Sequence, residues 1–303
     1  MGTELPLPKP TRAKIGPPIA FLDASAKQPN KETSLKLHKY SLALPGFILA
    51  VGLASSSLAI AADVPLVVPA DTTIPAGPEG DAIRLGRQLM NDTRKLLPRN
   101  VGNGLSCSSC HIAGGTQAYA SPYVGLTALF PMYNARDGRV ISLQTRIDDC
   151  FERSMNGHPL AWDSKEMNAM LIYIRWLSTG VPVGSQVVGR GMGQVDASLQ
   201  PDRARGATIY AAKCASCHGP QGAGTPDGSG GFVFPPVWGK QSYNTGAGMA
   251  RTATAAAFIK GKMPMGQPNS LSDQDAIDVA DFVAHQPRPV FAGAKPASPA
   301  RGR

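Results

Sequence analysis

Residues 107–111 read CSSCH and residues 214–218 read CASCH, so the pattern C-x-x-C-H occurs twice, about one hundred residues apart. The two cysteines of this pattern can add to the vinyl groups of one heme, and the histidine can bind the iron. A thioredoxin-like redox pair or half of a zinc site would explain one copy, but two copies favour heme. We therefore expect two covalently bound heme c groups, held by Cys107, Cys110 and His111 and by Cys214, Cys217 and His218.

The composition agrees with small heme-binding domains. The chain has 303 residues, enough for two domains with a leader and a tail, and it contains 33 Gly and 27 Pro, which favour loops. A small, loop-rich domain needs an additional source of buried apolar surface, and a heme macrocycle provides it.

The amino end is typical of an export signal. After a basic stretch, an apolar run from about Leu42 to Ile60 ends in Ala59-Ile60-Ala61, and we expect cleavage after Ala61. An uncleaved membrane anchor is the alternative, because the run is nearly long enough to span a bilayer. Pro45 and the serines at 55–57 favour cleavage. Residues 1–61 are thus expected to be a signal peptide with a long amino extension, directing the protein to the periplasm without stable membrane insertion.

The charge of the chain restricts its partners. The net charge is +9, of which +4 lies in residues 1–61 (seven Lys and Arg, three Asp and Glu), so +5 remains for the exported part. This mild positive charge suits a small anionic substrate or an acidic redox partner and gives no support to nucleic-acid binding.

Residues 201–288 are expected to form one of the two domains. A helical pattern over Arg203–Lys213 precedes the second motif, residues 232–239 (FVFPPVWG) could line a heme edge, and Ser272 is expected to cap a closing helix that Pro287 ends. This order resembles a class I cytochrome c domain over about residues 200–290.

Residues 62–182 follow the same plan. A helix from about Asp81 to Leu97 is expected before the first motif, and a closing helix begins near Asp163, with Glu166 completing a capping box. Residues 183–200 are expected to be a linker and residues 289–303 a disordered tail. The predicted fold class is all-α: two class I cytochrome c-like helical domains, each with one covalent heme.

The distal ligand of the second heme is expected between the motif and the closing helix. Met263, followed by proline, is the first candidate, because a His/Met pair suits electron transfer. Met265 is a close competitor, and the amine of Lys262 could bind iron if deprotonated.

The distal ligand of the first heme has three candidates, Met132, His158 and the fifth cysteine, Cys150. Residues 143–155 (LQTRIDDCFERSM) are expected to form one helix with an apolar face of Ile147, Phe151 and Met155, next to a stripe of Arg146, Cys150 and Ser154. An arginine one turn away favours the thiolate, which is both an iron ligand and a nucleophile. A buried free thiol is the alternative.

Three stretches resemble the diheme thiosulfate dehydrogenases: residues 100–111 (NVGNGLSCSSCH), 136–139 (RDGR) and 146–160 (RIDDCFERSMNGHPL). With FPPVWG and KMP in the second domain, the resemblance covers about residues 78–290. It implies oxidative coupling of two thiosulfates to tetrathionate, often reversible, in the periplasm. A small acceptor cytochrome or similar redox protein would take up the electrons.

The resemblance also implies a set of site residues. The active-site heme would have His111 and Cys150 as ligands, and the second heme would have His218 with Met263, or with Lys262 in one redox state. The substrate would meet Cys150, Arg136, Arg146 and Ser154. Planar guanidinium groups suit a dianion such as thiosulfate, although each arginine could instead pair with Asp137, Asp148 or a heme propionate.

Two other functions remain compatible with the sequence. A diheme electron carrier without a substrate would have Met or His, not Cys, on the first iron. A heme subunit of a sulfur-oxidising complex would have a stable partner and weak activity alone. A diheme peroxidase is less favoured, because no motif indicates peroxide chemistry.

Overall fold

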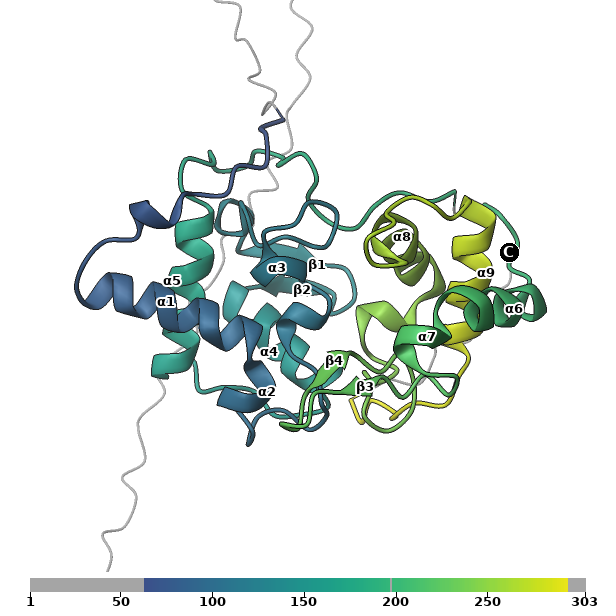
Figure 1. Cartoon of the computed structure of the whole chain (residues 1–303). Helices are drawn as coiled ribbons and strands as arrows, with labels where there is room; N and C mark the ends of the chain where they lie inside the picture. Colours follow the sequence, from purple (N-terminus) through teal and green to yellow (C-terminus); the bar gives the residue numbers. More distant parts are fainter. Residues whose placement is uncertain (1–62, 197, 294–303) are drawn as a thin grey trace, which may run out of the picture. The chain divides into compact units, whose positions relative to one another are not determined.

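A computed structural model describes residues 63–196 and 198–293 (Figure 1). The expected signal peptide and the last ten residues of the expected tail lie outside these ranges. None of the helices in the described ranges is both long enough and apolar enough to cross a membrane. The described chain is mostly helical, as the predicted fold class requires, with two short antiparallel hairpins.

The elements around the first motif run in the order α1, α2, α3, β1, β2, α4 and α5. Their bounds are Pro78–Asn91, Thr93–Leu96, Ile112–Gly115, Met132–Asn134, Arg139–Ile141, Leu143–Arg153 and Lys165–Leu177. The helix expected over 81–97 is interrupted at Asp92, whose φ of −116° and ψ of 40° are not helical. The helix expected over residues 143–155 was predicted correctly in type and start, but it ends at Arg153, two residues early. The cap of α5 is Ser164, which accepts a hydrogen bond from Met167 N, and not Asp163.

The elements around the second motif are α6, α7, β3, β4, α8 and α9. Their bounds are Arg203–Lys213, Ala215–His218, Thr225–Pro226, Phe232–Phe234, Thr252–Lys262 and Asp273–Ala284. Helix α6 has the predicted bounds, and Ser272 caps α9 by accepting a hydrogen bond from Asp275 N. Helix α8 was not predicted. Single 3₁₀ turns complete the list: Asp71–Thr73, Cys107–Ser109, Leu126–Ala128 and Gly248–Ala250.

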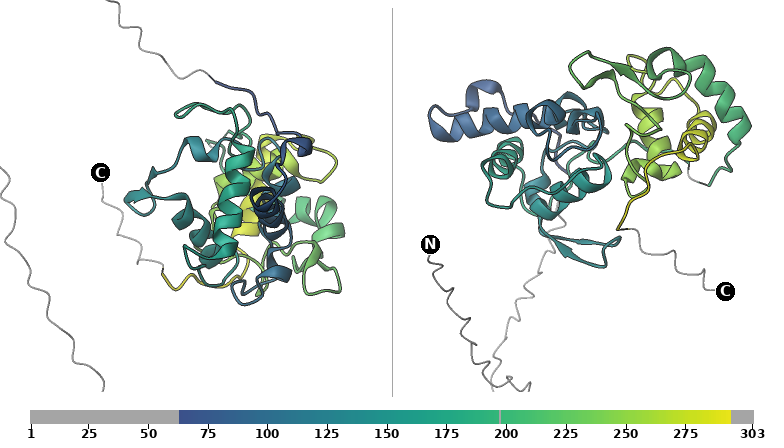
Figure 2. Two further views of the ribbon diagram at one scale, coloured as in Figure 1. Left: turned by 90° about the vertical axis from the view of Figure 1, so that its left-hand side faces the viewer. Right: turned by 90° about the horizontal axis from the view of Figure 1, so that it is seen from below.

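The first and last helices of each domain, α1 with α5 and α6 with α9, pack against each other (Figures 1 and 2). A glycine lies at each of these contacts. A Cβ atom added at Gly86 of α1 would lie 2.0 Å from the carbonyl oxygen of Ala169 on α5. A Cβ atom at Gly206 of α6 would lie 2.1 Å from the carbonyl oxygen of Asp278 on α9. The same close crossing therefore organises both domains, as expected for a duplicated helical unit.

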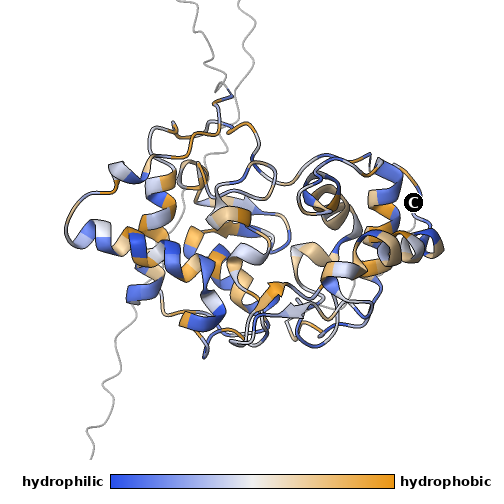
Figure 3. Ribbon diagram, viewed as in Figure 1, coloured by the Kyte–Doolittle hydropathy of each residue, from blue (hydrophilic) through white to orange (hydrophobic). Residues whose placement is uncertain are grey.

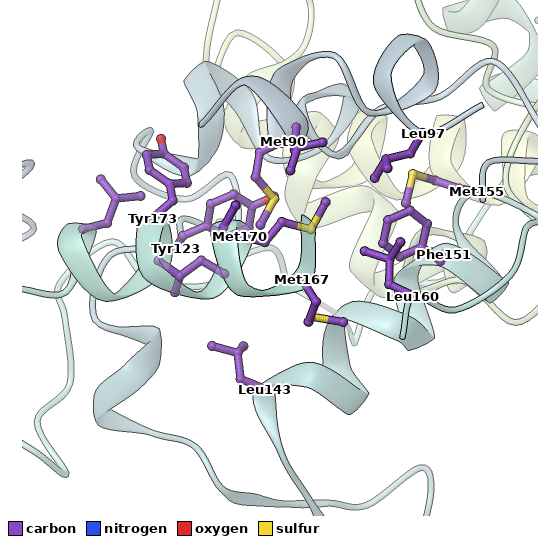
Figure 4. Packing of buried hydrophobic residues seen from close by; sticks show 14 of the residues in the cluster. Met90, Leu97, Tyr123, Leu143, Phe151, Met155, Leu160, Met167, Met170 and Tyr173 are labelled. Carbon is purple, nitrogen blue, oxygen red and sulfur yellow. The ribbon is translucent and has the colours of Figure 1, made fainter. Parts of the chain in front are cut away.

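The core of the first domain lies between these helices and α4. Most helices carry apolar residues on one side and polar residues on the other (Figure 3). Phe151 of α4 and Met155, just beyond the end of α4, are 0% and 2% exposed and lie beside Leu97 and Leu160 (Figure 4). Because this apolar face is buried, the rotation of α4 about its axis is fixed. The rotation determines where the neighbouring stripe, with Arg146 and Cys150, points.

The expected linker makes several contacts with the first domain. Val187 is buried and bridges to Val64, and the carbonyl oxygens of Gly189 and Gly191 accept hydrogen bonds from the nitrogens of Tyr119 and Ser121. These contacts attach the first half of the segment to the domain that precedes it. The domain boundaries themselves stay predictions.

We predict that Gly86→Ala destabilises the protein by about 1–3 kcal/mol, because overpacking against the α5 backbone outweighs the better helix propensity of alanine. Urea unfolding of the holoprotein measures this. Gln88→Ala, at an exposed position of the same helix, is the control and should be nearly neutral. Equal stability of Gly86→Ala and the wild type would contradict the close crossing.

Candidate functional site

The first C-x-x-C-H motif begins in a 3₁₀ turn that the start of α2 supports. The Thr93 hydroxyl accepts a hydrogen bond from Cys107 N at 3.1 Å and lies 3.3 Å from Cys107 Sγ. Ser106 and Ser109 form a capping box at the start of the turn. These contacts fix the position of the two cysteines relative to α2.

The imidazole of His111 is oriented by the backbone. Its Nδ1 lies 2.6 Å from the carbonyl oxygen of Ser121, so Nδ1 carries the hydrogen and donates it. The ring of Tyr123 lies alongside, with the ring centroids 4.6 Å apart. Desolvation lowers the pKa of His111 to about 4, against the effect of the Ser121 carbonyl. The ring is therefore neutral at neutral pH, and Nε2 is available as an iron ligand.

The second motif has the same arrangement. His218 Nδ1 donates to the carbonyl oxygen of Pro235 at 2.8 Å, and desolvation lowers the pKa of the ring. Tyr210 packs on Trp238 with a centroid distance of 4.7 Å and donates its hydroxyl hydrogen to Gly219 O at 2.7 Å. Each domain thus presents two thiols and an imidazole with a free Nε2, the donor set that a covalent heme c requires.

A cavity of about 520 Å³ adjoins the second motif. Its lining includes Cys214, Cys217 and His218, apolar residues from 232–237 and α9, and Cys110 of the first motif. The second motif therefore faces a largely apolar space of a size that suits a bulky planar ligand, and the residues present fit a heme. Both motifs contribute to the wall of the same cavity.

The candidates for the distal position of the second heme differ in exposure. Met263 and Met265 both line the cavity, but the Met265 side chain is 62% exposed whereas Met263 is half-buried at the end of α8. Lys262 is half-buried in the last turn of α8 and is not among the lining residues, and desolvation lowers its pKa. Burial favours Met263 over Met265, and its place in the cavity wall favours it over Lys262.

Arg146 and Cys150 are in direct contact on α4. Arg146 Nη1 lies 2.9 Å from Cys150 Sγ, one helical turn away. The charge of Cys150 raises the pKa of Arg146, against the effect of burial. Burial, and after it the charge of Cys150, raises the pKa of Cys107 and Cys110 to about 11 and about 12. The structure thus brings the Arg146–Cys150 pair close to the first motif.

The two other expected substrate contacts lie at opposite ends of the α4 region. Ser154 caps the C-terminus of α4, and its carbonyl oxygen accepts a hydrogen bond from Asn103 Nδ2 at 2.9 Å. Arg136 is exposed in the turn between β1 and β2, and its Nη1 donates to Gly246 O at 3.0 Å. Partial desolvation of its guanidinium, and after it the charges of Arg153, Arg251 and Arg146, lower the pKa of Arg136 although the residue as a whole is exposed.

The carboxylates that could have neutralised these arginines have other partners. Asp137 pairs with Arg153, and Asp148 accepts hydrogen bonds from Leu160 N and Trp162 Nε1. Within the described ranges, neither Arg136 nor Arg146 forms an ion pair with a carboxylate. Four arginines, called the basic region below, lie close enough together for the last three to lower the pKa of the first: Arg136, Arg153, Arg251 and Arg146. Of these, Arg136 and Arg146 keep a charge that an anion could neutralise.

The other candidates for the first distal position are less buried than Cys150. Met132 lies on β1 with 43% of its surface exposed, and His158 is exposed after the end of α4. Cys150 is half-buried and lies beside the motif.

The sequence reasoning did not identify Tyr123, Arg153 or Arg251 as neighbours of the Arg146–Cys150 pair or of the basic region. Only the repeated arginines, at 136, 146 and 153, could have indicated that this region is basic.

The chain matches two protein families. Residues 98–183 match the family described as "SoxA/TsdA, cytochrome c domain", and residues 203–287 match "Cytochrome c". A curated "Thiosulfate dehydrogenase" of Allochromatium vinosum is 48% identical over 261 residues, 85% of this chain and 96% of that protein. One of Psychrobacter arcticus is 48% identical over 225 residues, 74% of this chain and 69% of that protein.

A solved structure is also similar to this chain, and a second kind of relative matches a smaller part of it. The structure titled "Thiosulfate dehydrogenase (TsdBA) from Marichromatium purpuratum" is 38% identical, with a TM-score of 0.69, over 75% of this chain and 51% of that chain. A SoxA subunit of L-cysteine S-thiosulfotransferase, from Pseudaminobacter salicylatoxidans, is 31% identical over only 38% of this chain. Two cytochrome c domains indicate two covalently bound heme c groups. With these domains and this similarity over most of its length, the chain belongs to the thiosulfate dehydrogenase family.

Proposed function

We propose that this protein is an exported enzyme that oxidises thiosulfate in the periplasm, coupling two molecules into tetrathionate. The observation that carries the proposal is the contact between Arg146 and Cys150 near the first heme-binding motif. Within the described residues, Arg146 and Arg136 form no ion pair with a carboxylate, whereas Arg153 pairs with Asp137 and Asp149. The curated relatives, whose names state this activity, support the substrate.

The two domains would have different roles, with the active-site heme in the first and the electron-transfer heme in the second. The hemes supply two one-electron acceptors, enough for the two electrons that one coupling releases. His111 and Cys150 would hold the active-site heme, and His218 with Met263 would hold the second. An anionic thiolate ligand lowers a heme potential relative to a methionine ligand, so electron flow toward the second domain is downhill. From there a redox partner, such as a small acceptor cytochrome, would take up the electrons.

The basic region would bind the substrate. Arg146 and Arg136 can each offer two parallel N–H donors to the oxygens of a thiosulfate dianion. The Ser154 hydroxyl, on the stripe of Arg146 and Cys150, can donate a further hydrogen bond. Such contacts would direct the sulfane sulfur of the substrate toward Cys150 and offset the repulsion between two dianions.

Cys150 is placed to act as a covalent intermediary. Its thiolate and the sulfane sulfur of the first thiosulfate form a sulfur–sulfur bond as two electrons leave, which gives Cys–S–S–SO₃⁻. The second thiosulfate attacks the sulfane sulfur of this adduct, tetrathionate forms, and the thiolate of Cys150 is released. The same steps in reverse would reduce tetrathionate. The positive charge of Arg146 stabilises the thiolate in both steps.

The runner-up function is a diheme electron carrier with no substrate of its own. It would need no thiol at the first heme and no arginines left without a carboxylate partner near that thiol. The geometry around Cys150 therefore favours the enzyme. The heme subunit of a sulfur-oxidising complex is less favoured, because the SoxA similarity covers only 38% of the chain.

The proposal predicts that the purified holoprotein reduces ferricyanide with thiosulfate and forms one tetrathionate per two thiosulfates. Arg146→Gln should lower kcat/KM for thiosulfate by roughly 10- to 1,000-fold, because the substrate and the thiolate both lose a charged donor. Steady-state kinetics with tetrathionate quantified by chromatography measures both. Arg139→Gln, at an exposed position of β2, is the matched control and should behave as the wild type.

Two results would count against this assignment. No turnover of thiosulfate by the holoprotein, with both hemes attached and reducible by dithionite, would favour the electron carrier. An Arg146→Gln variant with an unchanged kcat/KM would remove that residue from the site.

The second domain supports a separate prediction. Met263→Leu should abolish the near-infrared absorbance typical of methionine bound to ferric heme, because Met263 is the more buried candidate. Met265→Leu, at the 62% exposed neighbour, is the control and should retain the band. Loss of the band only in Met265→Leu would identify Met265 as the ligand of the second heme iron. A band retained in both variants would show that neither methionine is required as the ligand.

A further inference from the structure

Residues 288–291 follow the loop 243–246 closely, although we expected a disordered tail from residue 289. The Arg288 guanidinium lies over the ring of Tyr243, 4.4 Å from its centroid. The nitrogen of Thr245 donates to Pro289 O at 3.0 Å, and Phe291 N donates to the Thr245 hydroxyl oxygen at 3.0 Å. Three contacts thus attach this part of the chain to the loop that carries Gly246.

The ring of Phe291 packs directly on the backbone of Gly246. A Cβ atom at Gly246 would lie 2.7 Å from Phe291 Cγ, so no larger residue fits beneath the ring. The carbonyl oxygen of Gly246 accepts the hydrogen bond from Arg136 Nη1 at 3.0 Å. The peptide group that holds the Arg136 side chain is therefore supported by Phe291.

Phe291 also contacts the group that holds the backbone of the same turn. The Arg153 guanidinium carbon lies 4.5 Å from the centroid of the Phe291 ring. Arg153 pairs with Asp137 at 3.3 Å, and Asp137 accepts a hydrogen bond from Asn134 Nδ2 at 2.9 Å. Asn134 Oδ1 in turn accepts from Arg136 N at 3.0 Å.

Arg136 needs such support because its neighbours repel it. The guanidinium charges of Arg153, Arg251 and Arg146 contribute to lowering the pKa of Arg136, and no carboxylate in the described ranges forms an ion pair with Arg136. The turn that carries Arg136 is short and exposed, and it includes Gly138 with a φ of +66°. Without external contacts, the guanidinium would sample many orientations.

We propose that Phe291 is a positioning residue for thiosulfate binding: its ring, between Gly246 and Arg153, holds Arg136 in the orientation that receives the anion. This inference rests on the proposed function and extends the substrate site to the C-terminal segment of the second domain. A ring is required, because an aliphatic side chain would fill space but would lose the attraction to the Arg153 cation.

The test compares three variants of the full-length holoprotein in the thiosulfate assay. Phe291→Leu should raise KM for thiosulfate about 3- to 10-fold with kcat changed less than about 2-fold, because binding is lost equally from ground and transition states. Phe291→Tyr keeps the ring and should restore the wild-type KM. Val290→Ala, at the neighbouring position that is 79% exposed, should change neither constant.

A purely structural role gives a different pattern. If Phe291 only joins the two domains, Phe291→Leu should lower Tm and kcat and leave KM unchanged, and that result would overturn the inference. An equal KM increase in the Leu and Tyr variants would also overturn it. Absence of thiosulfate turnover in the wild type would instead refute the proposed function, and with it this extension.

Discussion

The contact between the guanidinium of Arg146 and the sulfur of Cys150, at 2.9 Å, is the interaction on which the site depends. It exists because α4 is continuous from residue 143 to 153 and buries Phe151 on its adjoining face. Burial of that face fixes the rotation of the helix, and the rotation directs the thiol toward the first motif. The cation one turn away then lies within hydrogen-bond distance of a sulfur that could serve both as an iron ligand and as a nucleophile.

The second domain also contributes to the shape of the region around α4. Asn103 is buried just before the first motif, and its Nδ2 donates both to Ser154 O and to Ser242 O, which joins the end of α4 to the second domain. Asn244 makes a similar connection through Glu152 O. These buried amides fix the loop that carries Gly246 against α4. The same contacts that hold the domains together therefore also shape the basic region.

The sequence predicted the parts of the molecule that local patterns determine. The two motifs, the bounds of α6 and the cap of α9 follow from residue spacing and capping preferences. Helix α8 was missed because Ala255, Ala256, Ala257 and Phe258 are consecutive and buried, so they leave no helical periodicity. The break at Asp92 was missed because the apolar pattern continues across it.

The composition of the site was predictable only in part. Arg146 and Cys150 are four residues apart on one helix, so a pattern could bring them together. Arg136 is held by a hydrogen bond to the carbonyl oxygen of Gly246, which belongs to the other domain. Phe291 contacts Gly246 although the two residues are far apart in the sequence. Contacts between residues so distant along the chain leave no local signal.

The central claim is that Cys150 is a ligand of the first heme. Electron paramagnetic resonance of the oxidised holoprotein, beside the Cys150→Ala variant, tests it most directly. We expect a low-spin signal with the compressed g-spread of thiolate ligation in the wild type, absent from the variant. Ordinary His/Met or bis-His signals for both hemes, unaffected by the substitution, would contradict the account and favour a simple electron carrier.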